Sequence, residues 1–260
     1  MNELLKLAWS DFLSLFFVFI RVATILALVP FFNATVIPRR ISATIALFLS
    51  LVLMPIVPHV QVKPDELNVV MLMLIMVHEM LIGMALGLAI DVIYSGIQIA
   101  GELISFQMGF SIANVVDPMS GISAPIISNV FYMTAFLLFF TFEGHHILIK
   151  ALFESFSIMP IGDSLVHREF LMAVVTYAAK MFVIGVKVSA PVVGILMLIN
   201  ISFAIIARAL PQMNVFIMAF PLTIAVGLVF SVLVIKMLPM FMTSSLEQAW
   251  MFMKSAMALI

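Results

Sequence analysis

The chain of 260 residues has no cysteine and few charges, and these absences exclude several classes of protein. Without cysteine it forms no disulfide, no thiolate metal site and no cysteine nucleophile. Charged residues make up 10% of the chain, whereas soluble globular domains carry about 25%. The net charge of -1 gives no reason to expect a nucleic-acid partner.

Motifs of catalysis and nucleotide binding are also missing. There is no Gly-rich P-loop for ATP and no G-x-S-x-G nucleophile elbow. His78-Glu79 begins like a metalloprotease helix, but Ile82 stands where the second histidine is needed. In the run 143–146 (EGHH) three potential ligands crowd into four residues, with no second cluster at ligand spacing. We therefore expect no catalytic residue, cofactor or metal, and we expect Gly144 to end a helix.

Hydrophobic residues dominate what remains, at 65% of the chain and a mean hydropathy of +1.28. A soluble fold of this composition would expose a large apolar surface to water. We therefore predict an all-α integral membrane protein that forms one domain over residues 1–260. The sequence divides into six apolar blocks: Phe12–Phe32, Ile41–Val57, Leu67–Ile93, Ile126–Phe142, Phe170–Ile206 and Val215–Leu238.

The lengths of these blocks are compared with the roughly 20 apolar residues that a helix needs to cross a bilayer. Phe12–Phe32 and Val215–Leu238 fit that length, whereas Phe170–Ile206 is too long for one span. Because proline removes a helix hydrogen bond, Pro191 is predicted to kink or end the helix in this long block.

Charged residues within the apolar blocks are the first candidates for function. Each costs about 2.5–3.5 kcal/mol at the centre of a span, so each should face protein or a water-filled cavity. We expect them either to be buried in subunit interfaces or to form the ion pathway of a transporter. They are Arg21, Glu79, Asp91, Lys180 and Lys187.

Their spacing indicates which helix faces carry them. Glu79 and Asp91 lie on one stripe of a helix with Gly83 and Gly87 between them, each residue four positions from the next. The glycine pair allows another helix to approach closely. Lys180 and Lys187 are seven residues apart and also share a face, so we hypothesise that the two helices pair through these acids and lysines.

The segment 101–121 (GELISFQMGFSIANVVDPMSG) has a different character from the rest of the chain. It combines three glycines and a proline with only two charges, Glu102 and Asp117. Irregular backbone between hydrophobic spans persists only where it is buried in protein or lines a water-filled cavity. We therefore predict a pore, a gate or a binding site in this segment.

The segment 101–121 contains Gly101-Glu102, Gln107-Met108-Gly109-Phe110 and Asp117-Pro118. With further motifs along the chain, these resemble the FliR family of type III secretion export-gate subunits, and the resemblance covers essentially the whole chain. One departure is Glu143, where the family pattern leads us to expect Asn or Asp. The residues that carry the resemblance are Arg21, Pro30, Pro38-Arg39, Gly101-Glu102, Gln107-Met108-Gly109-Phe110, Asp117-Pro118, Gly144-His145, Pro191, the run 211–216 (PQMNVF), Pro221-Leu222 and Gly227-Leu228.

The resemblance implies an architecture and a function. Members look like a fusion of the partner subunits FliP and FliQ, with six or more long helices in tilted hairpins within a helical assembly. It implies a non-enzymatic subunit of the export gate in the bacterial inner membrane, at the flagellar basal body. Unfolded rod, hook and filament proteins are exported through the pore of this gate. The implied partners are several FliP-like and FliQ-like subunits around a single copy of this chain, FlhB, FlhA and membrane lipid.

The resemblance also implies that the loop over residues 106–125 plugs the pore. A constriction lined by apolar side chains excludes ions by dewetting, and its glycines let the backbone turn into the lumen. The alternative is a connecting loop packed statically between helices. The plug or gate residues are Phe106, Gln107, Met108, Gly109, Phe110, Ile112, Val115, Val116, Asp117, Pro118 and Met119, and a re-entrant turn is implied at Pro211, Gln212 and Asn214.

Two other functions remain open at this point. The first is an ion or small-molecule transporter that uses the charged residues of the apolar blocks. The second is the export gate of a virulence injectisome, which differs in its substrates. A transporter should act alone or as a homo-oligomer, whereas a gate subunit needs FliP-like and FliQ-like partners.

Overall fold

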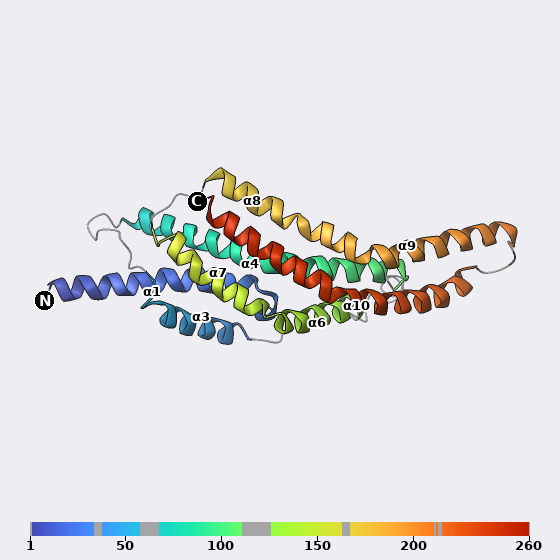
Figure 1. Cartoon of the computed structure of the whole chain (residues 1–260), viewed down its shortest axis with the longest axis horizontal. Coiled ribbons are helices and arrows are strands. Elements are labelled where there is room, and N and C mark those ends of the chain that lie inside the picture. Colours follow the sequence, from blue (N-terminus) through green and yellow to red (C-terminus); the bar gives the residue numbers. More distant parts are fainter. Residues whose placement is uncertain are drawn as a thin grey trace. The chain divides into compact units, whose positions relative to one another are not determined.

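The computed structural model describes residues 2–33, 38–57, 68–110, 126–162, 167–210, 212 and 215–259. Every regular element among them is a helix, as Figure 1 shows, so the all-α prediction is confirmed. The helices are α1 (Asn2–Leu28), α2 (Pro30–Asn33), α3 (Arg39–Leu53), α4 (Val69–Gln107), α6 (Ile126–Thr141), α7 (Gly144–Ile158), α8 (Arg168–Ala178), α9 (Lys180–Ala209) and α10 (Val215–Met257).

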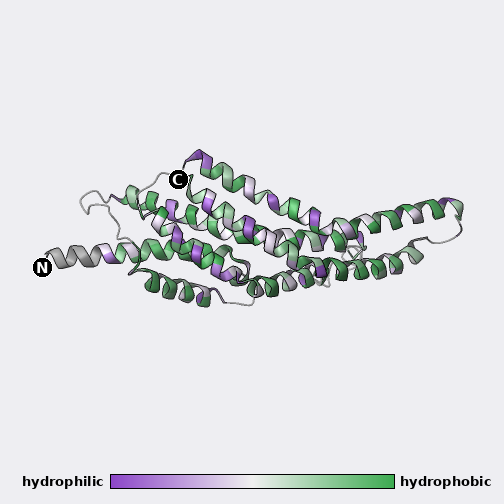
Figure 2. Cartoon of the chain, in the orientation of Figure 1, coloured by the Kyte–Doolittle hydropathy of each residue, from purple (hydrophilic) through white to green (hydrophobic). Residues whose placement is uncertain are grey.

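Long apolar helices suit this chain to a membrane. Figure 2 shows hydrophobic residues along nearly the whole length of the helices. Within the described residues, four stretches are long and apolar enough to cross a bilayer, and α6 with α7 adds a fifth if a broken helix counts as one span. The four stretches are Ser10–Leu28, Val69–Gln107, Arg168–Ala209 and Met218–Met257.

Three helix boundaries differ from the sequence-based predictions. The helix α4 continues through Gly101 to Gln107, so the first third of the segment expected to be irregular is helical. The helix α9 continues through Pro191, which therefore does not end it; the chain is interrupted at Ala179 instead. Proline is tolerated within membrane helices because neighbouring groups satisfy the freed backbone carbonyl.

The third boundary lies at Gly144, which begins α7 and does not end a helix. The turn before it is made by Glu143, whose φ of 55° lies in the left-handed region. Asparagine and aspartate adopt this conformation more readily than glutamate does. The conformation thus gives a physical reason for the Asn or Asp expected at position 143.

The chain divides into two compact units, which share α4 between them. The first unit comprises Met1–Val92, Glu143–Ala178 and Leu246–Ile260, and the second comprises Ile93–Phe142 and Ala179–Ser245. The prediction of one domain over the whole chain stays a prediction.

In the first unit, α1 packs closely on the N-terminal part of α4. A Cβ atom added to Gly83 would lie 2.8 Å from the Arg21 carbonyl oxygen, and one added to Gly87 would lie 2.8 Å from Leu28 Cβ. Only glycine allows an approach this close. Also in this unit, the Tyr177 hydroxyl of α8 donates a hydrogen bond of 3.4 Å to the Ala89 carbonyl oxygen of α4.

In the second unit, α6, α9 and α10 pack on the C-terminal part of α4. The Tyr94 ring of α4 contacts Phe139 of α6, with ring centroids 6.0 Å apart. A Cβ atom added to Gly185 of α9 would lie 2.6 Å from Ile99 Cγ2 of α4. Met108, directly after α4, packs against Gly227 of α10. The end of α4 is therefore held on several sides.

Candidate functional site: a buried ion pair and the end of helix α4

The first candidate site is an ion pair within the first unit, where Arg21 of α1 meets Glu79 of α4. Arg21 Nε donates to Glu79 Oε2 at 2.6 Å, and Nη2 donates to Oε1 at 3.1 Å. Both side chains are fully buried. Two parallel hydrogen bonds between a guanidinium and a carboxylate give a strong and geometrically specific interaction. Gly83, one turn after Glu79, lets α1 approach closely enough for this pair to form.

The same guanidinium also binds α7 and the residue that follows it. Its Nη1 donates to Ser155 Oγ at 3.0 Å, and its Nη2 donates to the Met159 carbonyl oxygen at 3.1 Å. The Phe156 ring covers the guanidinium, with Arg21 Cζ 4.1 Å from the ring centroid. One arginine thus joins three helices that are far apart in the sequence.

His78 stands beside this network without completing it. Its Nδ1 lies 3.9 Å from Glu79 Oε1, which is too far for a hydrogen bond. Both ring nitrogens are buried and have no hydrogen-bond partner among the described residues. His78 is therefore a polar neighbour of the ion pair and not one of its ligands.

The hypothesis that Glu79 pairs with a lysine is wrong, because both of its carboxylate oxygens bind Arg21. Asp91 is half-buried, and Lys180 and Lys187 are exposed on this chain. An interface role for these three residues stays a prediction.

The second candidate site is the C-terminal end of α4, where the predicted plug begins. Gly109 has a φ of 89°. Its N–H donates to the Phe106 carbonyl oxygen at 3.0 Å, and the Phe110 N–H donates to the Ser105 carbonyl oxygen at 3.1 Å. This pair of hydrogen bonds, with glycine in the left-handed region, is the Schellman motif that ends helices. The helix therefore stops at a defined residue, and the predicted loop starts at Met108 and not at Phe106.

Side chains on either side of this stop have opposite environments. Met108 is fully buried, and its carbonyl oxygen accepts a hydrogen bond of 3.5 Å from Thr223 Oγ1 of α10. Phe106, two residues earlier, is 69% exposed. Gln107 borders a cavity of about 460 Å³ with Asn200 of α9 and Phe220 of α10. Met108 thus anchors the segment, while Phe106 faces away from the protein.

The remainder of the predicted plug, Ile112, Val115, Val116, Asp117, Pro118 and Met119, lies outside the described residues. The chain re-enters them at α6, whose Ser128 hydroxyl donates to the Gln98 carbonyl oxygen of α4 at 3.1 Å. A Cβ atom on Gly101 would collide with the Ser128 backbone. Both ends of the segment 111–125 are therefore held within the second unit.

The other predicted sites are only partly described. Gln212 is exposed in the connection between α9 and α10, whereas Pro211 and Asn214 lie outside the described residues. In the run 143–146, Glu143 Oε2 lies 3.3 Å from His146 Nδ1. The described residues contain no group of three or more side chains arranged to hold a metal ion.

Comparison with known proteins places the chain in a family. Residues 12–249 match the family described as bacterial export proteins, family 1. The chain is 33% identical to the flagellar biosynthetic protein FliR of Bacillus subtilis (strain 168), over 88% of this chain and 87% of that protein. This chain belongs to the FliR family. It is also 30% identical to FliR of Escherichia coli (strain K12), over 85% of this chain and 84% of that protein.

Sequence reasoning found the charged residues of this FliR-family site but missed their neutral partners. Ser155, Phe156 and the Met159 carbonyl oxygen complete the arginine site from α7. Serine and phenylalanine are common in membrane helices, so no pattern marks these two. Their role depends on the position of α7 against α1, which the sequence does not specify.

Proposed function

We propose that this chain is a subunit of the flagellar type III protein export apparatus in the bacterial inner membrane. In this role it helps to form, and to close, the pore through which unfolded rod, hook and filament proteins leave the cytoplasm. The match of residues 12–249 to the export family and the names of the relatives support this proposal. This role requires no catalytic centre. The gate of a virulence injectisome would work by the same mechanism on other substrates.

The gate in this proposal is the segment that follows α4. The observation that carries it is the fixed base of that segment, where α4 ends at Gln107 in a turn made by Gly109, and Met108 is buried against α10. The exposed ring of Phe106 and the apolar residues Ile112, Val115 and Met119 then supply a water-excluding constriction. Flexible methionine side chains adapt to passing chains of different sequence.

Partner subunits follow from the same proposal. The helices of the stretch Arg168–Ala209 are apolar, yet only 11% of its most apolar window is buried within this chain. Lipid or other apolar subunits must cover that surface. We propose FliP-like and FliQ-like subunits around one copy of this chain, with FlhB and FlhA at the cytoplasmic side.

The buried charges fit this role better than they fit a transporter. Arg21 of α1 and Glu79 of α4 bind each other, and Arg21 also binds α7, with neither side chain of the pair open to solvent. An ion pathway needs groups that exchange protons or ions with water. The pair therefore serves as a fixed junction in the first unit.

The gate is tested by deleting residues 113–118 and measuring the uptake of a small dye that the intact membrane excludes. The matched control deletes residues 60–65, which connect α3 to α4 and lie outside the gate segment. We expect dye uptake to rise in the first variant and to stay at the wild-type level in the control. A tight membrane containing normal amounts of the first variant contradicts the gate.

The assembly is tested separately by co-expression with the FliP-like and FliQ-like proteins of the same genome and native mass spectrometry. We expect one copy of this chain with several copies of each partner. A stable monomer or homo-oligomer that ignores both partners rejects the assembly and favours a transporter.

A further inference from the structure

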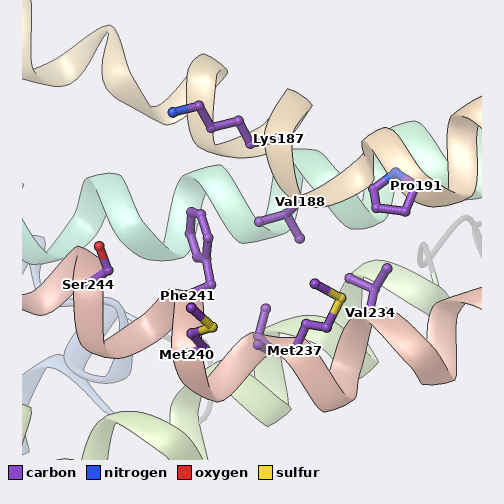
Figure 3. Close-up of a pocket in the computed structure, with 9 residues that line it drawn as sticks. Lys187, Val188, Pro191, Val234, Met237, Met240, Phe241 and Ser244 are labelled. Atoms are coloured by element: carbon purple, nitrogen blue, oxygen red, sulfur yellow. The ribbon is translucent and has the colours of Figure 1, made fainter.

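A cavity of about 300 Å³ lies in the second unit between α9 and α10 (Figure 3). Its volume is at the lower end of the range for small-molecule sites, about 300–1,000 Å³. Lys187 and Pro191 line it from α9, and Val234, Met237, Phe241 and Ser244 line it from α10. The lining is mainly apolar, with one cationic side chain.

The polar groups of this cavity lie toward one of its ends. Figure 3 shows Lys187 and Ser244 toward one end and Pro191 and Val234 toward the other, with Phe241 between them. Ser244 follows Val234 by ten positions along α10, a rise of about 15 Å in a helix. The cavity therefore has the polarity of an amphiphilic molecule with one anionic end.

Lys187 is a cation without a counter-charge among the residues that the structure describes. Its side chain is exposed, and it forms no ion pair with any residue that the structure describes. A lysine beside apolar surface keeps its ammonium where it can reach water or an anion, while its methylene groups cover the apolar wall. A ligand that brings both an anion and an apolar chain satisfies both parts of this site.

The charge pattern of α9 and α10 places the polar end at a membrane surface. The stretch Val188–Ala207, directly after Lys187, contains no charged residue, and neither does Val215–Ile235, directly before Lys236. Each stretch has about the 20 residues that cross the hydrocarbon core. Lys187 and Lys236 therefore border the hydrocarbon, and the cavity extends from this border at Lys187 into it at Pro191 and Val234.

We propose that this cavity binds an anionic glycerophospholipid, with the phosphate at Lys187 on the side of Phe241 and Ser244, and one acyl chain along Met237 toward Pro191 and Val234. The depth of the site matches the orientation of a bilayer lipid, whose headgroup lies at the surface and whose chains point inward. The methionine side chain adapts to the chain without a fixed geometry. This assignment uses only the charge pattern and the cavity, and it does not depend on the export function.

The lipid is tested in cells by replacing Met237, which is 63% exposed, with the photoreactive residue benzoylphenylalanine in the full chain. Cells are grown with labelled phosphate, irradiated, and the chain is purified under denaturing conditions. We expect a labelled phospholipid adduct that falls about fivefold in the Lys187→Gln background, since one lysine near an anionic surface contributes about that factor. Lys236→Gln is the matched control, because it removes an exposed lysine of α10 outside the cavity, and it should leave the adduct unchanged.

Native mass spectrometry of the full chain supplies a second measurement. We expect the wild-type chain to retain phosphatidylglycerol in preference to phosphatidylethanolamine, and Lys187→Gln to lose this preference. Equal adducts in both lysine variants overturn the proposal, and so does a crosslink to a protein in place of lipid. The second outcome would assign the cavity to a helix of another subunit.

Discussion

Replacing Glu79 by leucine leaves the Arg21 guanidinium buried without its counter-charge. Arg21 makes two hydrogen bonds to this carboxylate and one each to Ser155 and the Met159 carbonyl oxygen. A guanidinium stays charged at any physiological pH, so it cannot escape the penalty by losing a proton. Removing one partner of a buried ion pair costs about 3–5 kcal/mol, which is a large fraction of the roughly 5–15 kcal/mol that stabilises a typical domain.

Arg21→Met should be less damaging than Glu79→Leu. The glutamate left behind can take up a proton and become neutral, which reduces the penalty for its burial. The lost partner of the Met159 carbonyl oxygen then contributes about 1–3 kcal/mol. In the double variant both charges are gone, and apolar side chains of similar volume often replace a buried ion pair without loss. We therefore expect the double variant to be more stable than Glu79→Leu alone.

The assay is equilibrium unfolding of the purified chain in mixed micelles with increasing dodecyl sulfate, followed by the loss of helical circular dichroism. The four proteins of this cycle give the coupling free energy of the pair directly. A loss below about 1 kcal/mol in Glu79→Leu would refute a role for the pair in holding the first unit together. Strict addition of the two single effects would refute the contact between them.

Four further variants test the backbone at three glycines and at Glu143. Gly109→Ala places a Cβ at a φ of 89° and should cost about 1–2 kcal/mol; a wild-type thermal midpoint would contradict the Schellman stop. Gly83→Ala should lower the thermal midpoint, because its Cβ would lie 2.8 Å from the Arg21 carbonyl oxygen. Gly194→Ala is the control: a Cβ there would have no atom within 4 Å, so the higher helix propensity of alanine should raise the midpoint. Equal effects of the two variants would contradict the close approach of α1. Glu143→Asn should stabilise the folded chain by about 0.5–1 kcal/mol, because Asn tolerates the φ of 55° better than Glu does. A lower thermal midpoint would show that the lost contact between Glu143 and His146 outweighs this gain.

The predictions from sequence succeeded where composition or local chemistry decides the structure. An apolar chain with few charges was expected to form membrane-spanning helices, because a helix satisfies all of its backbone hydrogen bonds within itself when it lies in lipid. The predictions failed at boundaries that neighbours decide. Pro191 lies within α9 and does not end it, so only the kink stays a prediction. Gly101 lies within α4, where the close approach of the Ser128 backbone leaves no room for a Cβ atom.

The candidate site shows the same division. Burial of Arg21 and Glu79 could be inferred from their apolar surroundings, since a charge in lipid is costly. The pairing of Arg21 with Glu79 could not be inferred, because Lys180 or Lys187 could equally well have neutralised the buried carboxylate. The spacing of Gly83 and Gly87 indicated a close helix contact, but not that the partner is α1.

By itself, the sequence determined that this protein consists of apolar helices, which charges need partners, and that the glycines after position 106 let the backbone turn. These properties depend on the residue and its nearest neighbours along the chain. Only the tertiary structure decided that Arg21 joins α1, α4 and α7, that Met108 is buried while Phe106 is exposed, and that Lys187 borders an apolar cavity. Such contacts join residues 58 and 134 positions apart, and hydrophobic patterning does not distinguish between partner helices that are all apolar.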